Sequence, residues 1–178
     1  MSDQADPALS TAPPKAGGAL PLSPADWRLV AWRGFLRTHT HLLRQLEQDL
    51  QAHGKIALGS YDVLVQLAEA PDNRLRMSEL AEAVLLSRSG LTRLVDRMQR
   101  DGLVSRAPDP DDARGLYTVL TEQGRDALRD AANVHLAGIS RLVFDRISEA
   151  ELRQLLRLMR KLDPAPAPDP LATRHDLN

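Results

Sequence analysis

Proline is confined almost entirely to the two ends of this 178-residue chain. Five of its 12 prolines lie at or before Pro24, four lie between Pro164 and Pro170, and only three remain in the long stretch between. Proline lacks a backbone N–H and interrupts helices, so a stretch this poor in proline can form long ones. The chain also holds 31 leucines against six aromatic residues. We therefore predict a mainly α protein.

The two proline-rich ends are predicted to be disordered tails, residues 1–22 and 164–178. They are rich in Ala, Pro, Ser, Gly and Asp and show no apolar periodicity. Such segments bury too little apolar surface to offset the chain entropy lost on folding. The remaining ~140 residues have the size of a single domain.

The composition excludes several classes of protein. Cysteine is absent, which rules out disulfide frameworks, thiolate zinc sites and thiol nucleophiles. No apolar run approaches the ~18 residues that indicate a transmembrane helix, and the first residues lack a signal-peptide pattern. We expect a cytoplasmic protein with no membrane partner. The net charge of −1 argues against a nucleic-acid partner only if charge is spread evenly.

The region 23–58 is predicted to form a long N-terminal helix. Ser23 can cap it with Pro24 at its first position, and leucines recur at seven-residue spacing from Leu29 to Leu50. Gly54 ends it. The helix is apolar on more than one side, which requires more than one packing partner.

The region 122–163 is predicted to form two further helices. One begins after Thr121, and the other opens at the capping box of Ser148 and Glu151. Together with the N-terminal helix they present more apolar surface than the small middle region can cover. We predict that they form the dimerisation region of a twofold homodimer; the alternative is a monomer in which they pack only on each other.

Residues 59–121 are predicted to form a winged helix-turn-helix. A helix from near Ser60 stops before Pro71, and a short helix follows with Ser78 as its cap. The next helix begins near Ser87 and places four apolar residues on one stripe: Leu91, Leu94, Val95 and Met98. Gly102 ends it, and two short strands then flank the polar loop PDPDDARG.

The last of these helices, which begins near Ser87, has the features of a DNA-recognition helix. Its 14 residues from Ser87 to Arg100 contain four arginines and one aspartate, a charge of +3. Arginine suits guanine edges and phosphates, and such helices enter the major groove with their first half. The residues predicted to reach base edges are Ser89, Thr92 and Arg93, and those predicted to contact the DNA backbone are Ser87, Arg88 and Arg97. A solvated helix face would explain the charges taken alone.

The hairpin loop holds a second candidate site. Arg114 can reach an adjacent minor groove, and Asp112 can orient its guanidinium through a charge-assisted hydrogen bond. An ordinary acidic surface turn is the alternative. A calcium loop fails, because Arg114 stands where such a loop requires glycine and Leu120 where it requires glutamate.

The segment from Tyr61 to Leu128 resembles the MarR family of bacterial transcriptional regulators. The resemblance lies in SGLTRLVDRM, DGLVSR, the wing motif from Asp112 to Gly115, and LTEQG. It implies a homodimer on pseudo-palindromic double-stranded DNA, with repression relieved by a small aromatic or phenolic ligand. It also assigns Arg114 to the minor groove, Asp112 to its support and residues 87–97 to the recognition helix.

The family's ligand pocket lies between the dimer helices and the winged lobe. This position makes four residues candidates for effector binding: Trp32, His39, Tyr61 and Asp62. We expect no cofactor and no metal, because His39 and His41 lie two apart on a helix and face different sides. No catalytic motif is present, so an enzyme is not expected. A transcriptional activator of the same fold and a winged protein-interaction module remain alternatives.

Overall fold

The computed structural model describes residues 26–84, 88–109 and 115–162. Both predicted tails lie outside the described residues, as do Ser87, Asp112, Arg114 and the side chain of Arg88. The chain divides into two compact units between Thr38 and His39. The first unit contributes the beginning of one helix, and the second holds every other element described below.

Helix α1 (Trp27–Ala52) begins where Asp26 caps it. The Asp26 carboxylate accepts a hydrogen bond from the backbone N–H of Arg28 at 2.9 Å, which satisfies one of the donors left open at a helix start. The predicted cap, Ser23, lies outside the described residues. The end at Gly54 is confirmed: its φ is 63°, and the next amide closes the turn on the Leu50 carbonyl at 2.9 Å.

Helix α2 (Leu58–Glu69) starts two residues earlier than the sequence predicts. Its N-cap position is Ala57, whose side chain cannot accept a hydrogen bond. The carboxylate of Glu47 in α1 instead accepts from the backbone N–H of Leu58 at 2.7 Å. A cap supplied by another helix leaves no local signal, which explains why the prediction began at Ser60.

The helix-turn-helix follows a 3₁₀ turn (Pro71–Asn73) and a strand, β1 (Arg74–Arg76), that the sequence did not predict. Helix α3 spans Met77–Ala83 and helix α4 spans Arg88–Arg100. The prediction of Ser78 as the cap of α3 is wrong, since Ser78 lies inside the helix. The reason is that the Glu79 carboxylate accepts a hydrogen bond from the backbone N–H of Arg76 at 2.8 Å. The helix therefore begins at Met77, before Ser78.

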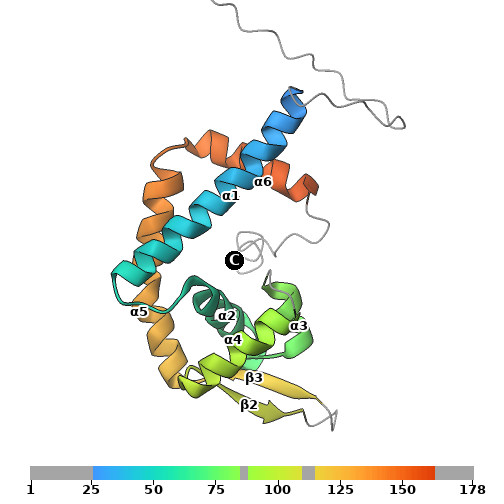
Figure 1. Ribbon diagram of the computed structural model, residues 1–178, viewed down its shortest axis with the longest axis vertical. Coiled ribbons are helices and arrows are strands. Elements are labelled where there is room, and N and C mark those ends of the chain that lie inside the picture. The colour runs from blue at the N-terminus through green and yellow to red at the C-terminus, as the bar shows by residue number, and fades with distance from the viewer. Residues whose placement is uncertain (1–25, 85–87, 110–114, 163–178) are drawn as a thin grey trace, which may run out of the picture. The chain divides into compact units, whose positions relative to one another are not determined.

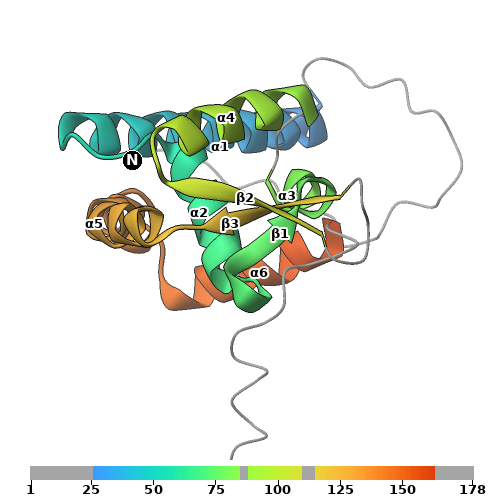
Figure 2. The same ribbon diagram turned by 90° about the horizontal axis from the view of Figure 1, so that it is seen from below.

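The predicted hairpin is confirmed as β2 (Val104–Pro108) and β3 (Leu116–Leu120). The sheet has three antiparallel strands in the order β1-β3-β2. Thr118 of β3 therefore lies between Leu75 of β1 and Arg106 of β2. Figure 2 shows α4 across one face of the sheet, where it contacts β2.

Helix α5 (Glu122–Ile139) is followed by a π-helical turn (Ser140–Phe144) and by α6 (Glu149–Leu162). The predicted capping box of α6 is confirmed, because the Ser148 amide donates to the Glu151 carboxylate at 2.8 Å. Figure 1 shows α2 in the middle of the second unit, where it contacts α3, α4, α5 and β3.

Two apolar clusters hold the second unit together. The larger joins α2, α3, α4 and the sheet, and contains Val63, Leu64, Leu67, Leu80, Leu91, Val95 and Met98. The smaller joins the second half of α1 to α2, α5 and the π-helical turn, through Leu46, Leu50, Tyr61, Ala131 and Leu142. The protein is thus mainly helical, as predicted, and its sheet has one strand more than the predicted hairpin. No helix within the described residues is long and apolar enough to span a membrane.

Candidate nucleic-acid interface and ligand cavity

Helix α4 has an apolar face and an opposite polar face. The predicted stripe is confirmed: Leu91 and Val95 are completely buried, and Leu94 and Met98 are nearly so. The stripe fixes the helix against α2 and α3, so its other side is turned outward. Four predicted DNA-contacting residues are exposed on that side: Ser89, Thr92, Arg93 and Arg97.

A salt bridge from the sheet makes this surface more basic than α4 alone would be. Arg106 of β2 pairs with Asp96, the acidic residue of α4. Asp96 therefore does not offset the positive charge of the exposed arginines on α4. A hollow of about 310 Å³ lies beside this pair, and Ser78, Thr92 and Arg106 are among its lining residues. Polar side chains from α3, α4 and β2 therefore line one hollow, together with the apolar Met77 and Leu116.

The base of the wing is held by a cluster that the sequence did not reveal. Arg76 of β1 pairs with Asp109 at the end of β2, whose side chain is fully buried. The Arg76 guanidinium also lies 5.7 Å from the centre of the Tyr117 ring of β3. A hydrogen bond with Tyr117 and the charge of Asp109 raise the pKa of Arg76. These residues are distant in sequence and meet only because β1 pairs with β3.

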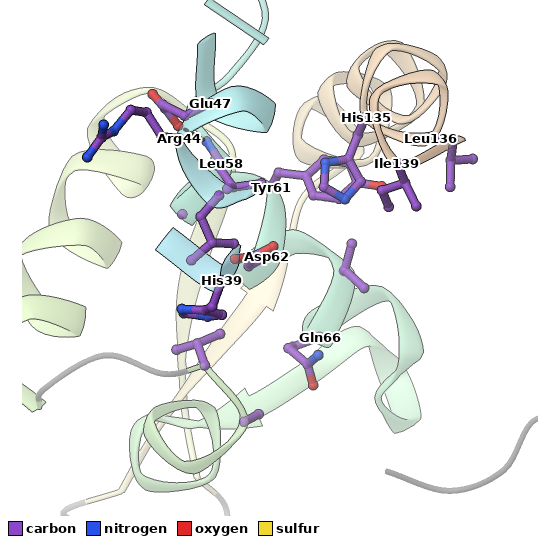
Figure 3. A pocket seen from close by; sticks show the side chains of 15 residues that line it. His39, Arg44, Glu47, Leu58, Tyr61, Asp62, Gln66, His135, Leu136 and Ile139 are labelled. Atoms are coloured by element: carbon purple, nitrogen blue, oxygen red, sulfur yellow. Dashed lines mark hydrogen bonds between the residues drawn. The ribbon is translucent and has the colours of Figure 1, made fainter. Parts of the chain in front are cut away.

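A cavity of about 800 Å³ lies between α1, α2, α3 and α5, and three of the predicted effector residues line it: His39, Tyr61 and Asp62. Figure 3 shows these side chains around one space. Trp32 is not among the lining residues; it stacks on Phe35, with ring centres 5.9 Å apart, in the first unit. His135 of α5 also lines the cavity and was not predicted, because it belongs to no recognisable sequence motif.

Tyr61, Asp62 and His135 influence one another electrostatically. The Tyr61 and His135 rings are 4.3 Å apart. Burial raises the pKa of Tyr61, with a further contribution from Asp62. Loss of hydration raises the pKa of Asp62, and nearby His135 opposes that rise. Burial lowers the pKa of His135, which favours the neutral ring.

Comparison with known proteins places this architecture in a family. A sequence profile described as "MarR family" matches residues 56–115. The crystal structure of AbsC, a MarR family transcriptional regulator from Streptomyces coelicolor, is 36% identical with a TM-score of 0.71, covering 78% of this chain and 93% of AbsC. The chain belongs to the MarR family of transcriptional regulators.

Two further relatives bear on function. Sco3205 from Streptomyces coelicolor, a MarR family regulator crystallised in complex with DNA, is 33% identical with a TM-score of 0.75, covering 82% of this chain and 91% of that protein. The HTH-type transcriptional repressor YetL from Bacillus subtilis is 31% identical over 101 residues. That match covers 57% of this chain and 60% of YetL.

The LTEQG segment that carries part of the MarR resemblance has a structural explanation. The Thr121 hydroxyl caps α5 by accepting the Gly124 amide at 2.9 Å, and Gln123 donates to the Asp101 carbonyl at 3.0 Å. Gly124 lies against the backbone of Leu103, where a Cβ would come within 2.0 Å of the carbonyl oxygen. Through these contacts the segment joins the start of α5 to the end of α4 and to the residue before β2.

Metal binding finds no support in the described ranges. No three histidine or acidic side chains gather there in a way that could hold an ion. Asp111 and Asp112 of the hairpin loop lie outside the described residues.

Proposed function

We propose that this protein is a sequence-specific DNA-binding repressor of transcription that reads its operator with α4. The single observation that carries the proposal is the outward face of α4, with exposed Arg93 and Arg97 beside a sheet arginine that neutralises Asp96. Helices of this kind enter the major groove. The DNA complex of Sco3205 and the repressor name of YetL support the proposal by analogy.

Two copies are needed for this mode of binding to a pseudo-palindromic operator. The single chain leaves large apolar side chains exposed in both units: Trp27, Trp32 and Phe35 in the first, and Leu155, Leu156, Leu158 and Leu162 in the second. Helix α6 buries no residue at all within the described chain. Apolar surface on this scale is characteristic of an interface. We infer a twofold homodimer that presents two copies of α4 to successive major grooves.

Release from DNA is assigned to a small molecule bound in the cavity. The cavity contacts α3 through Ala83 and Val84 and contacts α5 through His135 and Ile139. A ligand there touches both the DNA-binding element and a helix outside it. It shifts the DNA-binding equilibrium only if it prefers one arrangement of these helices over the other.

The test begins with selection of bound duplexes from a random pool, followed by fluorescence anisotropy on the enriched sequence. Arg93→Ala should lower affinity about 10- to 100-fold and relax the preference at particular base pairs. Arg153→Ala removes the same charge from an exposed position on α6 and should change neither property. Uniform weakening on all sequences would reassign Arg93 to the DNA backbone.

The wing and the dimer are tested separately. Arg114→Ala should weaken binding and reduce the slope of affinity against salt by about one, as expected when one phosphate or groove contact is lost. Sedimentation should give the mass of a dimer at micromolar concentration. If the selection enriches no sequence, DNA recognition is rejected and the protein-interaction alternative is favoured. Transcription of a reporter behind the selected operator separates repression from activation.

A further inference from the structure

The cavity of about 800 Å³ combines an aliphatic wall with several polar side chains. Seven of its lining residues are aliphatic, namely Leu43, Leu58, Val65, Ala83, Val84, Leu136 and Ile139. Such a wall accepts a largely hydrocarbon body by excluding water from it. Discrimination between ligands therefore depends on the polar groups and on their charges.

Asp62 is the acidic group best placed to meet a ligand. In Figure 3 its carboxylate lies in the middle of the lining residues, between His39 and the Tyr61–His135 pair. Glu47, the other acidic lining residue, already accepts the Leu58 amide at 2.7 Å and a hydrogen bond from Gln51. Asp62 therefore offers a negative charge and acceptor oxygens to a ligand in the cavity.

His135 offers a second acceptor beside it. Its Nδ1 atom is buried and has no hydrogen-bond partner among the described residues. A neutral imidazole whose Nε2 carries the proton presents Nδ1 as an acceptor. A buried polar atom without a partner is costly, so a donor brought by a ligand would be stabilised there.

The basic lining residue does not offset these acceptors. Arg44 is exposed, and Figure 3 shows its guanidinium pointing away from Asp62. An anionic ligand would meet the carboxylates of both Glu47 and Asp62. A cation would meet an opposite charge at Asp62, which is exposed, as Arg44 is.

We propose that the cavity selects ligands that combine an apolar body with a protonated amine, held by the Asp62 carboxylate with His135 as a second acceptor, and that it discriminates against carboxylic acids. Tyr61 flanks the head group with its ring, and the aliphatic wall contacts the body. This ligand class refines the proposed function and rests on it in one respect, namely that binding of the amine releases DNA. Binding of the amine to the cavity does not depend on the proposed function.

The experiment uses three probes with one apolar body: 2-naphthylmethylamine, 2-naphthylmethanol and 2-naphthoate. Titration calorimetry with the full chain at pH 7 should show the amine binding at least about tenfold more tightly than the carboxylate, with the alcohol between them. Asp62→Asn removes the charge and keeps the shape, and should abolish the advantage of the amine over the alcohol. Asp130→Asn removes an equal charge from an α5 carboxylate outside the cavity and should leave the order unchanged.

The outcomes separate this proposal from the proposed function. Tighter binding of 2-naphthoate, equal binding of amine and alcohol, unchanged amine affinity in Asp62→Asn, or no binding of any probe would each overturn the amine assignment. Anisotropy with the selected duplex is then measured with each probe added. Amine binding without any DNA binding would reject the proposed function alone, whereas DNA binding with a preference for the carboxylate would reject the ligand class alone.

Discussion

Replacing Gly124 with alanine tests how the wing is joined to the rest of the protein. Gly124 is buried in the first turn of α5, a position where alanine would ordinarily stabilise a helix by about 1 kcal/mol over glycine. Here a Cβ would lie 2.0 Å from the Leu103 carbonyl oxygen and 3.0 Å from a methyl group of Leu120. A backbone carbonyl cannot rotate away as a side chain can.

The magnitude follows from what must move. To reach a tolerable contact, the start of α5 must shift by about 1 Å, an overpacking that costs about 1–3 kcal/mol. The shift also strains the Thr121 cap, which contributes about 1 kcal/mol. After the gain in helix propensity is subtracted, Gly124→Ala should lower the free energy of unfolding by about 1–3 kcal/mol.

Gly59→Ala is the matched control, because Gly59 also lies in the first turn of a helix. Its added Cβ would make an ordinary contact at 3.7 Å with Leu94, so the same substitution should be neutral or stabilise by up to about 1 kcal/mol. Urea unfolding followed by circular dichroism, at one fixed protein concentration, measures both variants. A Gly124→Ala variant as stable as the unmodified protein would refute the argument from close approach.

Two further predictions concern charge. Because burial lowers the pKa of His135, the unfolded chain binds a proton more readily than the folded chain, so stability should fall as the pH drops below about 6.5. His135→Gln cannot titrate and should flatten this part of the pH dependence of urea unfolding between pH 7.5 and 5.5; an identical slope would contradict it. The raised pKa of Asp62 has the opposite sign and acts at lower pH, where protonation of the folded state is favoured. Arg76→Met should weaken DNA binding by loosening the wing, with no change in the salt slope, since Arg76 is occupied by Asp109 and Tyr117. A slope reduced by about one would instead make Arg76 a phosphate contact.

Features encoded over short stretches were predictable from the sequence. The apolar stripe of α4, the glycine ends at Gly54 and Gly102, and the capping box of α6 each depend on residues within one or two helical turns. The basic character of α4 was also visible in this way, despite a net charge of −1 for the whole chain. A global sum of charge carries no information about where the charges lie.

Features that depend on distant partners were not predictable. The start of α2 is set by Glu47 of α1, and β1 exists because Arg74–Arg76 finds β3 as a partner. The cluster of Arg76, Asp109 and Tyr117 follows from that pairing. No pattern around any one of these residues marks it, because hydrogen bonds and ion pairs between elements depend on the folded arrangement.

The candidate ligand site shows the same division. Tyr61 and Asp62 could be proposed from the pocket position that the resemblance to the MarR family implies, but His135 enters the site only through the packing of α5 against α2. By itself, the sequence determined the mainly helical fold, the winged helix-turn-helix and the outward basic face of α4, because helix periodicity and capping are local. The tertiary structure alone decided which acceptors face the cavity, because the charge that a ligand meets is set by side chains brought together from separate helices.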